Sequence, residues 1–433
     1  REKCNANDGS ICLRQNFIAQ RSITRITLLR IRCDTLITET TVDGTNGWKN
    51  YGELNINKIK MISLGSMTPQ IFLRDYWQKK PLLVRNALPG FNGLLTKDEL
   101  MELACCEDAQ SRLVVQKNGK WRLKHGPLSS YELAKLPKKQ WTLLVQDVNH
   151  FLPSARDLLT RFRFIPHARL DDLMVSYAPK GGGIGPHFDS YDVFLLQGLG
   201  SRRWQISAQK DDQFVADAPL RILQDFRPEQ EWVLEAGDML YLPPQYAHNG
   251  IAEEDCMTYS IGFRAPSHHE LITQFLVYLQ DNFETEGWYS DPNLSWQSHP
   301  SRISAAMQRQ TRSILKKIKW DYKDVENFLG IYLSEPKSHI FFEQPEEPLS
   351  SRLFLQQVMN NGVRLDLKSR LLSGDGKFFM NGEVYNVGMD AYKLLLNLAD
   401  NHEIIPVSRI DEEAGKVLYQ WYVSGYLESN NGE

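Results

Sequence analysis

The sequence has 433 residues, of which 42% are hydrophobic and 24% charged, and its formal net charge is −3. Such a chain is globular and longer than one usual core, so two or three domains are expected. The small net charge excludes a general electrostatic surface for nucleic acid. Six cysteines without a Cys-x-x-Cys pair exclude a disulfide framework and a zinc ribbon, and favour reduced thiols in the cytoplasm.

Residues 1 to 60 differ from the rest of the chain. They hold three of the six cysteines and show no sustained period of 2 or 3.6 residues. We interpret them as a non-native or disordered extension and expect the native protein to start at Met61. A disordered native tail is the alternative interpretation.

Residues 61 to 150 alternate helical and extended patterns. Thr68 and Pro69 predict the start of a helix that ends before Pro81. A strand is expected from Leu82 and a helix over Lys97 to Ala104. We expect this α/β part to brace the core that follows.

The next segment carries the first candidate metal ligands. Residues 181 to 189 read Gly-Gly-Gly-Ile-Gly-Pro-His-Phe-Asp, and the pattern becomes extended after the glycines. In a strand, residues i and i+2 point to the same face, so His187 and Asp189 project together. This spacing alone also fits two polar residues on a half-exposed strand. The glycines match neither a P-loop nor a dinucleotide fingerprint, so a flexible strand connection is favoured, and their lack of side chains allows a close backbone approach near a pocket.

A third ligand is expected downstream. A Gly-Asp turn at residues 237 and 238 leads into a short apolar strand, which stops at Pro243 and Pro244. His248 follows at the rim of that strand. Two histidines and one carboxylate form the facial triad typical of non-haem Fe(II), with positions left open for other ligands.

Helical patterns dominate after residue 266. One helix is indicated around Leu271 to Leu279, which is too short and too interrupted to span a bilayer, and another through Ile303 to Ile318. The second carries a basic cluster that fits a solvated helix face or a contact with RNA or an acidic partner. Residues 343 to 348 predict a linker.

The C-terminal part has its own pattern of elements. We expect a helix over Arg352 to Asn360, a hairpin turning at Asn381-Gly382, and helices over Asp390 to Leu398 and near Val417 to Tyr426. Residues 349 to 433 contain eight Lys/Arg and eleven Asp/Glu, so direct DNA binding is not expected.

Several longer motifs carry a resemblance to a known family. They are Tyr-Trp-Gln-Lys-Lys-Pro at 76 to 81, Gly126-Pro127, Gln-Asp-Val-Asn-His at 146 to 150, the segment 181 to 189, and Tyr-Ser-Ile-Gly-Phe-Arg-Ala-Pro at 259 to 266. From about Met61 to its end, the sequence resembles the jelly-roll oxygenases that depend on Fe(II) and 2-oxoglutarate. Within them it is similar to the JmjC branch, and there to the bacterial ribosomal-protein arginine hydroxylases.

The resemblance implies an α+β fold with a double-stranded β-helix, or cupin-like jelly-roll, at its centre. The implied domains are 61–150, the bracing part; 151–266, the JmjC catalytic core; 267–345, a helical region that makes a homodimer; and 346–433, a winged-helix-like domain. The implied reaction is hydroxylation, by dioxygen and 2-oxoglutarate, of the β carbon of an arginine in the sixteenth protein of the large ribosomal subunit.

The resemblance also implies roles for further residues. A basic residue fifteen positions after His187 is expected to bind the far carboxylate of 2-oxoglutarate, which selects Arg202, although strand parity cannot separate it from Arg203. Ser176 is expected to assist.

Four residues are implied to bind the substrate arginine, whose guanidinium requires a carboxylate and further acceptors. They are Asp172, Met174, Tyr191 and Ser260. Asp171 adjoins Asp172, and a turn or cap is the alternative role for such an aspartate.

Two other functions stay open at this point. Another JmjC-type enzyme, such as a histidyl hydroxylase or a demethylase, would use the same iron chemistry. A non-redox cupin isomerase or binding module is the second alternative. The aspartate at the second ligand position and the arginine at position 202 argue against it.

Overall fold

The computed structural model describes residues 60–117, 119–211 and 213–429. The extension predicted for residues 1 to 60, apart from Lys60, lies outside the described residues. The chain forms two compact units, which meet in sequence between Arg264 and Ala265.

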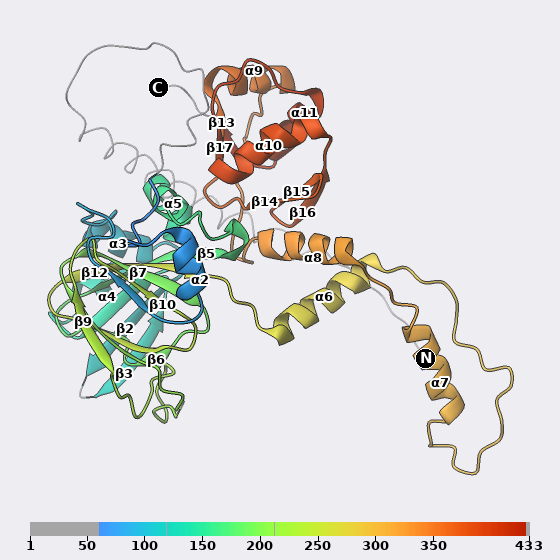
Figure 1. Ribbon diagram of the computed structural model, residues 1–433, viewed down its shortest axis with the longest axis horizontal. Coiled ribbons are helices and arrows are strands. Elements are labelled where there is room, and N and C mark those ends of the chain that lie inside the picture. Colours follow the sequence, from blue (N-terminus) through green and yellow to red (C-terminus); the bar gives the residue numbers. More distant parts are fainter. Residues whose placement is uncertain (1–59, 118, 212, 430–433) are drawn as a thin grey trace, which may run out of the picture. The chain divides into compact units, whose positions relative to one another are not determined.

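Within the described residues, the first unit holds twelve strands and six short helical segments (Figure 1). The strands are β1 (Leu82–Val84), β2 (Ser111–Lys117), β3 (Lys120–His125), β4 (Trp141–Val145), β5 (Leu170–Ala178), β6 (His187–Phe188), β7 (Asp192–Leu199), β8 (Arg202–Ser207), β9 (Gln230–Leu234), β10 (Met239–Leu242), β11 (Ala247–Ala252) and β12 (Cys256–Phe263). The helices are α2 (Pro69–Asp75), α3 (Lys97–Ala104), α4 (Ser130–Ala134), α5 (Pro153–Thr160), and the 3-10 turns η2 (Val148–His150) and η3 (His167–Arg169).

Two antiparallel sheets form the jelly-roll. The larger one has the order β1-β10-β7-β12-β5-β4-β2-β3, and the smaller one has the order β6-β11-β8-β9. β12 lies near the centre of the larger sheet, and all eight of its residues are buried. A strand is buried on both faces only where other layers cover both sides of its sheet. The burial of every residue of β12 therefore shows that the larger sheet is covered on both sides.

Helices and aromatic side chains cover the outer face of the larger sheet. Thr96 begins α3 with a capping box in which it exchanges hydrogen bonds with Glu99. α3 packs against β4 and β5. Phe72, from α2, packs its ring 5.6 Å from Phe194 and 4.9 Å from Tyr241, measured between centroids. This layer anchors strands β7 and β10, which extend toward the pocket described below.

The second unit combines helices with two three-stranded sheets. The helices are α6 (His268–Asn282), α7 (Ala305–Leu315), α8 (Tyr322–Ser334), α9 (Ser351–Asn361), α10 (Met389–Asn401) and α11 (Glu412–Val423). The strands are β13 (Val363–Leu365), β14 (Leu371–Gly374), β15 (Lys377–Met380), β16 (Glu383–Asn386), β17 (Glu403–Ile404) and β18 (Leu427–Ser429). No helix in the described part of the chain is long and apolar enough to cross a membrane.

α8 packs on the sheet formed by β14, β15 and β16. The contact is so close that a Cβ at Gly330 would lie 2.4 Å from ring atoms of Phe379. The hydroxyl of Ser334 accepts a hydrogen bond of 3.0 Å from the backbone N–H of Gly382, in the β15–β16 turn. α8 therefore belongs to the packing of the C-terminal sheet, although it precedes the linker expected at residues 343 to 348.

Most sequence-predicted elements are present. α3 has the predicted bounds, and α9 and the hairpin turning at Asn381-Gly382 lie where they were expected. α2 ends at Asp75, whereas the helix was predicted to continue until just before Pro81. α11 begins at Glu412, ahead of the predicted start near Val417. α5 and α8 were not predicted.

Candidate metal centre and its pocket

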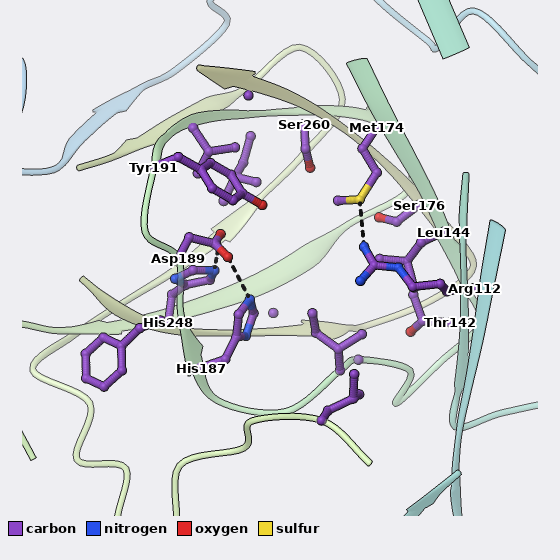
Figure 2. A pocket seen from close by; sticks show the side chains of 18 of the residues that line it. Arg112, Thr142, Leu144, Met174, Ser176, His187, Asp189, Tyr191, His248 and Ser260 are labelled. Carbon is purple, nitrogen blue, oxygen red and sulfur yellow. Dashed lines mark hydrogen bonds and ion pairs between the residues drawn. The ribbon is translucent and has the colours of Figure 1, made fainter. Parts of the chain in front are cut away.

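His187 and His248 face each other on neighbouring antiparallel strands. β6 pairs with β11 so that His248 lies directly opposite His187. The centroids of their rings are 4.2 Å apart. Asp189 follows β6, and its carboxylate oxygens lie 3.8 Å from His187 Nε2 and 3.5 Å from His248 Nε2 (Figure 2). One ligand atom from each residue lies within 4.8 Å of the others.

The second nitrogen of each imidazole is held by the backbone. His187 Nδ1 lies 2.9 Å from the carbonyl oxygen of Gly185, and His248 Nδ1 lies 3.0 Å from that of Tyr246. Because a carbonyl only accepts, Nδ1 of each ring donates its hydrogen to that carbonyl, which turns Nε2 toward the space beside Asp189, where it can bind a metal. Burial and the nearby His187 lower the pKa of His248 to about 4, so its ring is neutral at pH 7.

The glycine-rich loop allows β6 to lie against β11. A Cβ at Gly183 would lie 2.5 Å from the carbonyl oxygen of Gly250 in β11, and one at Gly182 would lie 2.2 Å from that of Trp141. Any side chain at these positions would force the loop away from the sheet. The close approach expected from the sequence is therefore present, and it fixes the separation of the two histidines.

This donor set suits a divalent transition metal. Two imidazoles and one carboxylate on one side of an ion leave its other positions open, which is the arrangement of non-haem Fe(II) oxygenases. The restrained tautomers match the way proteins orient metal-binding histidines. The three residues that the sequence singled out thus have the geometry required of an iron site.

A cavity of about 270 Å³ adjoins the three residues and is lined from both sheets. All nine candidate site residues from the sequence line it: Asp172, Met174, Ser176, His187, Asp189, Tyr191, Arg202, His248 and Ser260. The structure therefore brings together residues that span 89 positions of the chain, from 172 to 260 counted inclusively.

Three of these residues are placed by β5. Asp172, Met174 and Ser176 alternate along the strand and so share the face that lines the cavity. At about 3.3 Å per residue, Asp172 and Ser176 are separated by about 13 Å along the strand. Ser260, on β12, lies directly opposite Met174.

Asp172 and Tyr191 meet at one end of the pocket. A Cβ at Gly262 would lie 3.3 Å from Asp172 Oδ1 and 3.9 Å from the ring of Tyr191, so both side chains use the space that this glycine leaves. Burial, with the negative charges of Asp189 and Asp172, raises the pKa of Tyr191. Its hydroxyl, which points into the pocket (Figure 2), therefore stays protonated and able to accept as well as donate.

Asp192 holds the chain next to Tyr191. Its fully buried carboxylate accepts hydrogen bonds from the hydroxyl of Tyr241 at 2.7 Å and from Gln78 Nε2 at 2.8 Å, and Arg169 Nη2 lies 3.4 Å away. These partners come from three separate parts of the first unit. They fix the start of β7, and with it the position of Tyr191.

Arg202 lies at the other end of the pocket, with 4% of its surface exposed. Its Nη1 donates to Ser176 Oγ at 3.2 Å, while Nε and Nη2 are buried and have no hydrogen-bond partner among the residues that the structure describes. Arg203, the alternative that strand parity left open, instead forms ion pairs with Glu231 and Glu253 at the surface. A buried guanidinium with two unused donors is suited to a carboxylate ligand.

Some pocket residues escaped the sequence analysis. Arg112 comes from β2, Thr142 and Leu144 from β4, and Trp204 from β8. Trp204 is two residues after Arg202, so strand alternation could have indicated it. No local pattern places β2 and β4 beside β5, because that pairing joins distant parts of the chain.

Removal of one ligand tests the metal site. We expect His248→Ala or Asp189→Ala to weaken Co(II) binding at least about 100-fold, since even loss of an outer partner of a ligand costs up to that much. Calorimetry of the purified, metal-free chain would measure it. His299→Ala, at an exposed position, is the matched control and should bind as the parent does. Equal affinity in all variants would refute the site.

Comparisons with known proteins agree with this geometry. The JmjC domain family matches residues 157–271, and the family described as ROXA-like winged helix matches residues 317–428. A solved structure described as YcfD, a ribosomal oxygenase from Escherichia coli, in complex with cobalt and 2-oxoglutarate has 30% sequence identity and a TM-score of 0.72. The match covers 85% of this chain and 99% of that one.

Two curated relatives are similar over long stretches. The ribosomal protein uL16 3-hydroxylase of Escherichia coli K12 is 36% identical over 314 residues, which are 72% of this chain and 84% of the relative. The probable ribosomal oxygenase of Haemophilus influenzae Rd is 43% identical over 249 residues, 56% of this chain and 59% of the relative. The chain therefore belongs to the family of ribosomal oxygenases, JmjC dioxygenases that use Fe(II) and 2-oxoglutarate and carry a ROXA-like winged helix.

Proposed function

We propose that this oxygenase hydroxylates the β carbon of an arginine in the sixteenth protein of the large ribosomal subunit. The E. coli relative bears the name ribosomal protein uL16 3-hydroxylase, and it is 36% identical to this chain. A ribosomal protein substrate would place the activity in the cytoplasm. The choice of arginine rests on the pocket, as follows.

The order of charges along the pocket carries the proposal. Asp172 lies at one end of the pocket-lining face of β5, and Ser176, bonded to Arg202, lies about 13 Å further along it. The metal ligands contribute to the same cavity. A cationic side chain is favoured at the first end and an anionic molecule at the second, so the two reactants would approach the metal from opposite sides.

The end formed by Asp172 suits a guanidinium. Its carboxylate can accept two parallel N–H bonds from that planar group, and the hydroxyls of Tyr191 and Ser260 offer neutral acceptors beside it. Met174, opposite Ser260, supplies an apolar wall for the methylene stem. Together these groups would satisfy the charge and most of the donors of an arginine.

The end formed by Arg202 suits 2-oxoglutarate. Its two unused donors and the hydroxyl of Ser176 would hold the far carboxylate, while His187, Asp189 and His248 would hold the metal. Bound Fe(II), with 2-oxoglutarate and dioxygen, supplies the oxidation that replaces a carbon-bound hydrogen by hydroxyl and releases succinate and carbon dioxide. The protein's own contribution is to orient both reactants in a cavity that limits the access of water.

Histidine hydroxylation is the second candidate within the family. It needs the same metal and cosubstrate, but a neutral imidazole does not require a buried carboxylate. Asp172 is 7% exposed and receives a backbone N–H from Asp147 at 3.2 Å. The retention of this buried acid beside the metal site favours the arginine substrate.

The reaction is tested by anaerobic reconstitution with Fe(II), followed by 2-oxoglutarate, air and a peptide from the large-subunit protein. We expect succinate together with one added oxygen on an arginine, read by mass spectrometry. Oxidation on histidine would support the second candidate. Succinate without peptide oxidation would preserve the oxygenase and refute this substrate, and folded, iron-loaded protein that forms no succinate would refute the oxygenase reaction.

Asp172→Asn separates substrate recognition from the metal chemistry. We expect kcat/KM for the peptide to fall about 10- to 100-fold, because a hydrogen-bonded charge pair with the guanidinium is lost. Binding of 2-oxoglutarate should stay unchanged. Asp171→Asn is the matched control, since Asp171 lies 3.5 Å from Arg264 Nε in an ion pair, and it should have a small effect. Equal losses in the two variants would contradict this role of Asp172.

We also propose that α6 mediates a homodimer. One side of α6 packs on α8, with the ring centroids of Phe275 and Phe328 5.3 Å apart. On another side, Ile272 and Leu276 are each 59% exposed and one helical turn apart. Adjacent exposed apolar side chains of this size are typical of an interface, and a second copy offers the same surface.

Leu276→Glu tests the dimer. We expect the parent chain to sediment as a dimer and the variant to shift toward monomer, because a buried unpaired carboxylate opposes association. Met389→Glu, at a position that is 78% exposed on α10, is the control and should remain dimeric. Analytical ultracentrifugation at several concentrations measures both. A monomeric parent chain would disprove the dimer.

A further inference from the structure

Unused hydrogen-bond donors gather in the pocket. In the described part of the chain, five buried side-chain atoms without a hydrogen-bond partner belong to residues that line it: Arg112 Nε, Thr142 Oγ1, Arg202 Nε, Arg202 Nη2 and Trp204 Nε1. Each unsatisfied buried polar atom is costly to stability. Their concentration in one cavity therefore indicates a ligand with several acceptors, and Arg202 alone accounts for two of the five.

Arg112 reaches this cluster from outside the motifs that carry the metal ligands and Arg202. It lies on β2 opposite Leu144 on β4, which in turn lies opposite Ser176 on β5. Residues opposite one another share a face of the sheet, so Arg112, Leu144 and Ser176 form one row. The guanidinium of Arg112 extends along that row toward the side chains of Met174 and Ser176 (Figure 2).

The charge of Arg112 is not balanced within the described residues. Its one hydrogen bond there is from Nη2 to Met174 Sδ, at 3.9 Å, and a thioether is a weak acceptor. No ion pair is formed by Arg112 in residues 60–117, 119–211 and 213–429. A partly buried guanidinium held only by a sulfur atom is stabilised when an anion binds.

The row places the backbone of Arg112 at the Ser176 end of the pocket, while its Nη2 reaches Met174, one step toward Asp172. Ser176, in the same row, already accepts from Arg202 Nη1. Asp172 lies four residues back along β5, at the opposite end. A cation on the side of Ser176 would assist an anionic ligand, whereas a cationic substrate would be repelled by it.

We propose that Arg112 is a second guanidinium for 2-oxoglutarate, sharing the far carboxylate with Arg202 and Ser176, and that Thr142 donates to the same group. This assignment rests on the proposed cosubstrate site. A carboxylate has two oxygens and about four acceptor positions. Arg202 uses two of them through Nε and Nη2, the same pair of atoms through which Arg74 binds both oxygens of Asp75. About two positions remain, and Arg112 and the hydroxyls of Ser176 and Thr142 would share them.

A consequence concerns the product. Succinate keeps the same far carboxylate after the reaction, so it would also be held by both guanidinium groups. Arg112 thus affects the affinity of the cosubstrate and of the product in the same direction.

The test compares Arg112→Met with Arg112→Lys and with Arg122→Met. Arg122 is an exposed arginine on the neighbouring strand β3, and its replacement removes the same charge from the surface. Calorimetry of the full chain loaded with Co(II) would use succinate and 2-oxoglutarate as probes. We expect Arg112→Met to weaken the binding of both acids about 10- to 100-fold and Arg112→Lys to weaken it less. Arg122→Met should leave the affinity for both acids unchanged.

Kinetics give a second readout that a purely structural role would not produce. The KM for 2-oxoglutarate should rise in Arg112→Met, while the KM for the peptide stays constant at saturating 2-oxoglutarate. A raised peptide KM with unchanged binding of both acids would place Arg112 on the substrate side and overturn the proposal. If Arg112→Met fails to fold, Arg112→Lys decides, because full acid affinity with the shorter, non-planar cation would also overturn it.

The two levels of failure are distinguishable. If the parent chain binds neither acid, the proposed cosubstrate site itself is wrong. If the parent binds both, and Arg202→Met weakens binding while Arg112→Met leaves it unchanged, only the role of Arg112 is wrong.

Discussion

The pairing of β6 with β11 is the constraint on which the site depends. A register that sets His248 opposite His187 brings two imidazoles within reach of one ion, and a shift by one residue would turn one of them away. The carbonyls of Gly185 and Tyr246 then fix which ring nitrogen each histidine presents to the site. Since β6 has only two residues, its position depends on the glycine loop before it.

Local sequence was enough to predict much of the fold and the metal ligands. Thr96 with Glu99, and Asn381 with Gly382, are short-range signals that begin a helix and close a hairpin whatever the rest of the chain does. His187 and Asp189 are likewise related by the period of a single strand. Only the third ligand, His248, required an argument across distant parts of the chain.

The remaining site residues depend on contacts that no local period encodes. Arg112 enters the pocket because β2 and β4 extend the sheet beyond β5, and strand order is a long-range property. The choice between Arg202 and Arg203 stayed open because Gly198 and Gly200 interrupt the alternation before them. α8 was not predicted. Its apolar side chains pack on the sheet of β14, β15 and β16, which follows it in sequence, so its partner is not evident from the local pattern.

The spacing along β5 has a consequence for regiochemistry. A strand is stiff, so the distances between Asp172, Met174 and Ser176 along β5 are fixed beside the metal ligands. If Asp172 binds the substrate as proposed, a side chain whose charged tip rests there would present to the metal the carbon that lies a set number of bonds back from that tip. Which carbon is oxidised would then be decided by side-chain length measured against the strand, and a longer or shorter cationic side chain would offer a different atom.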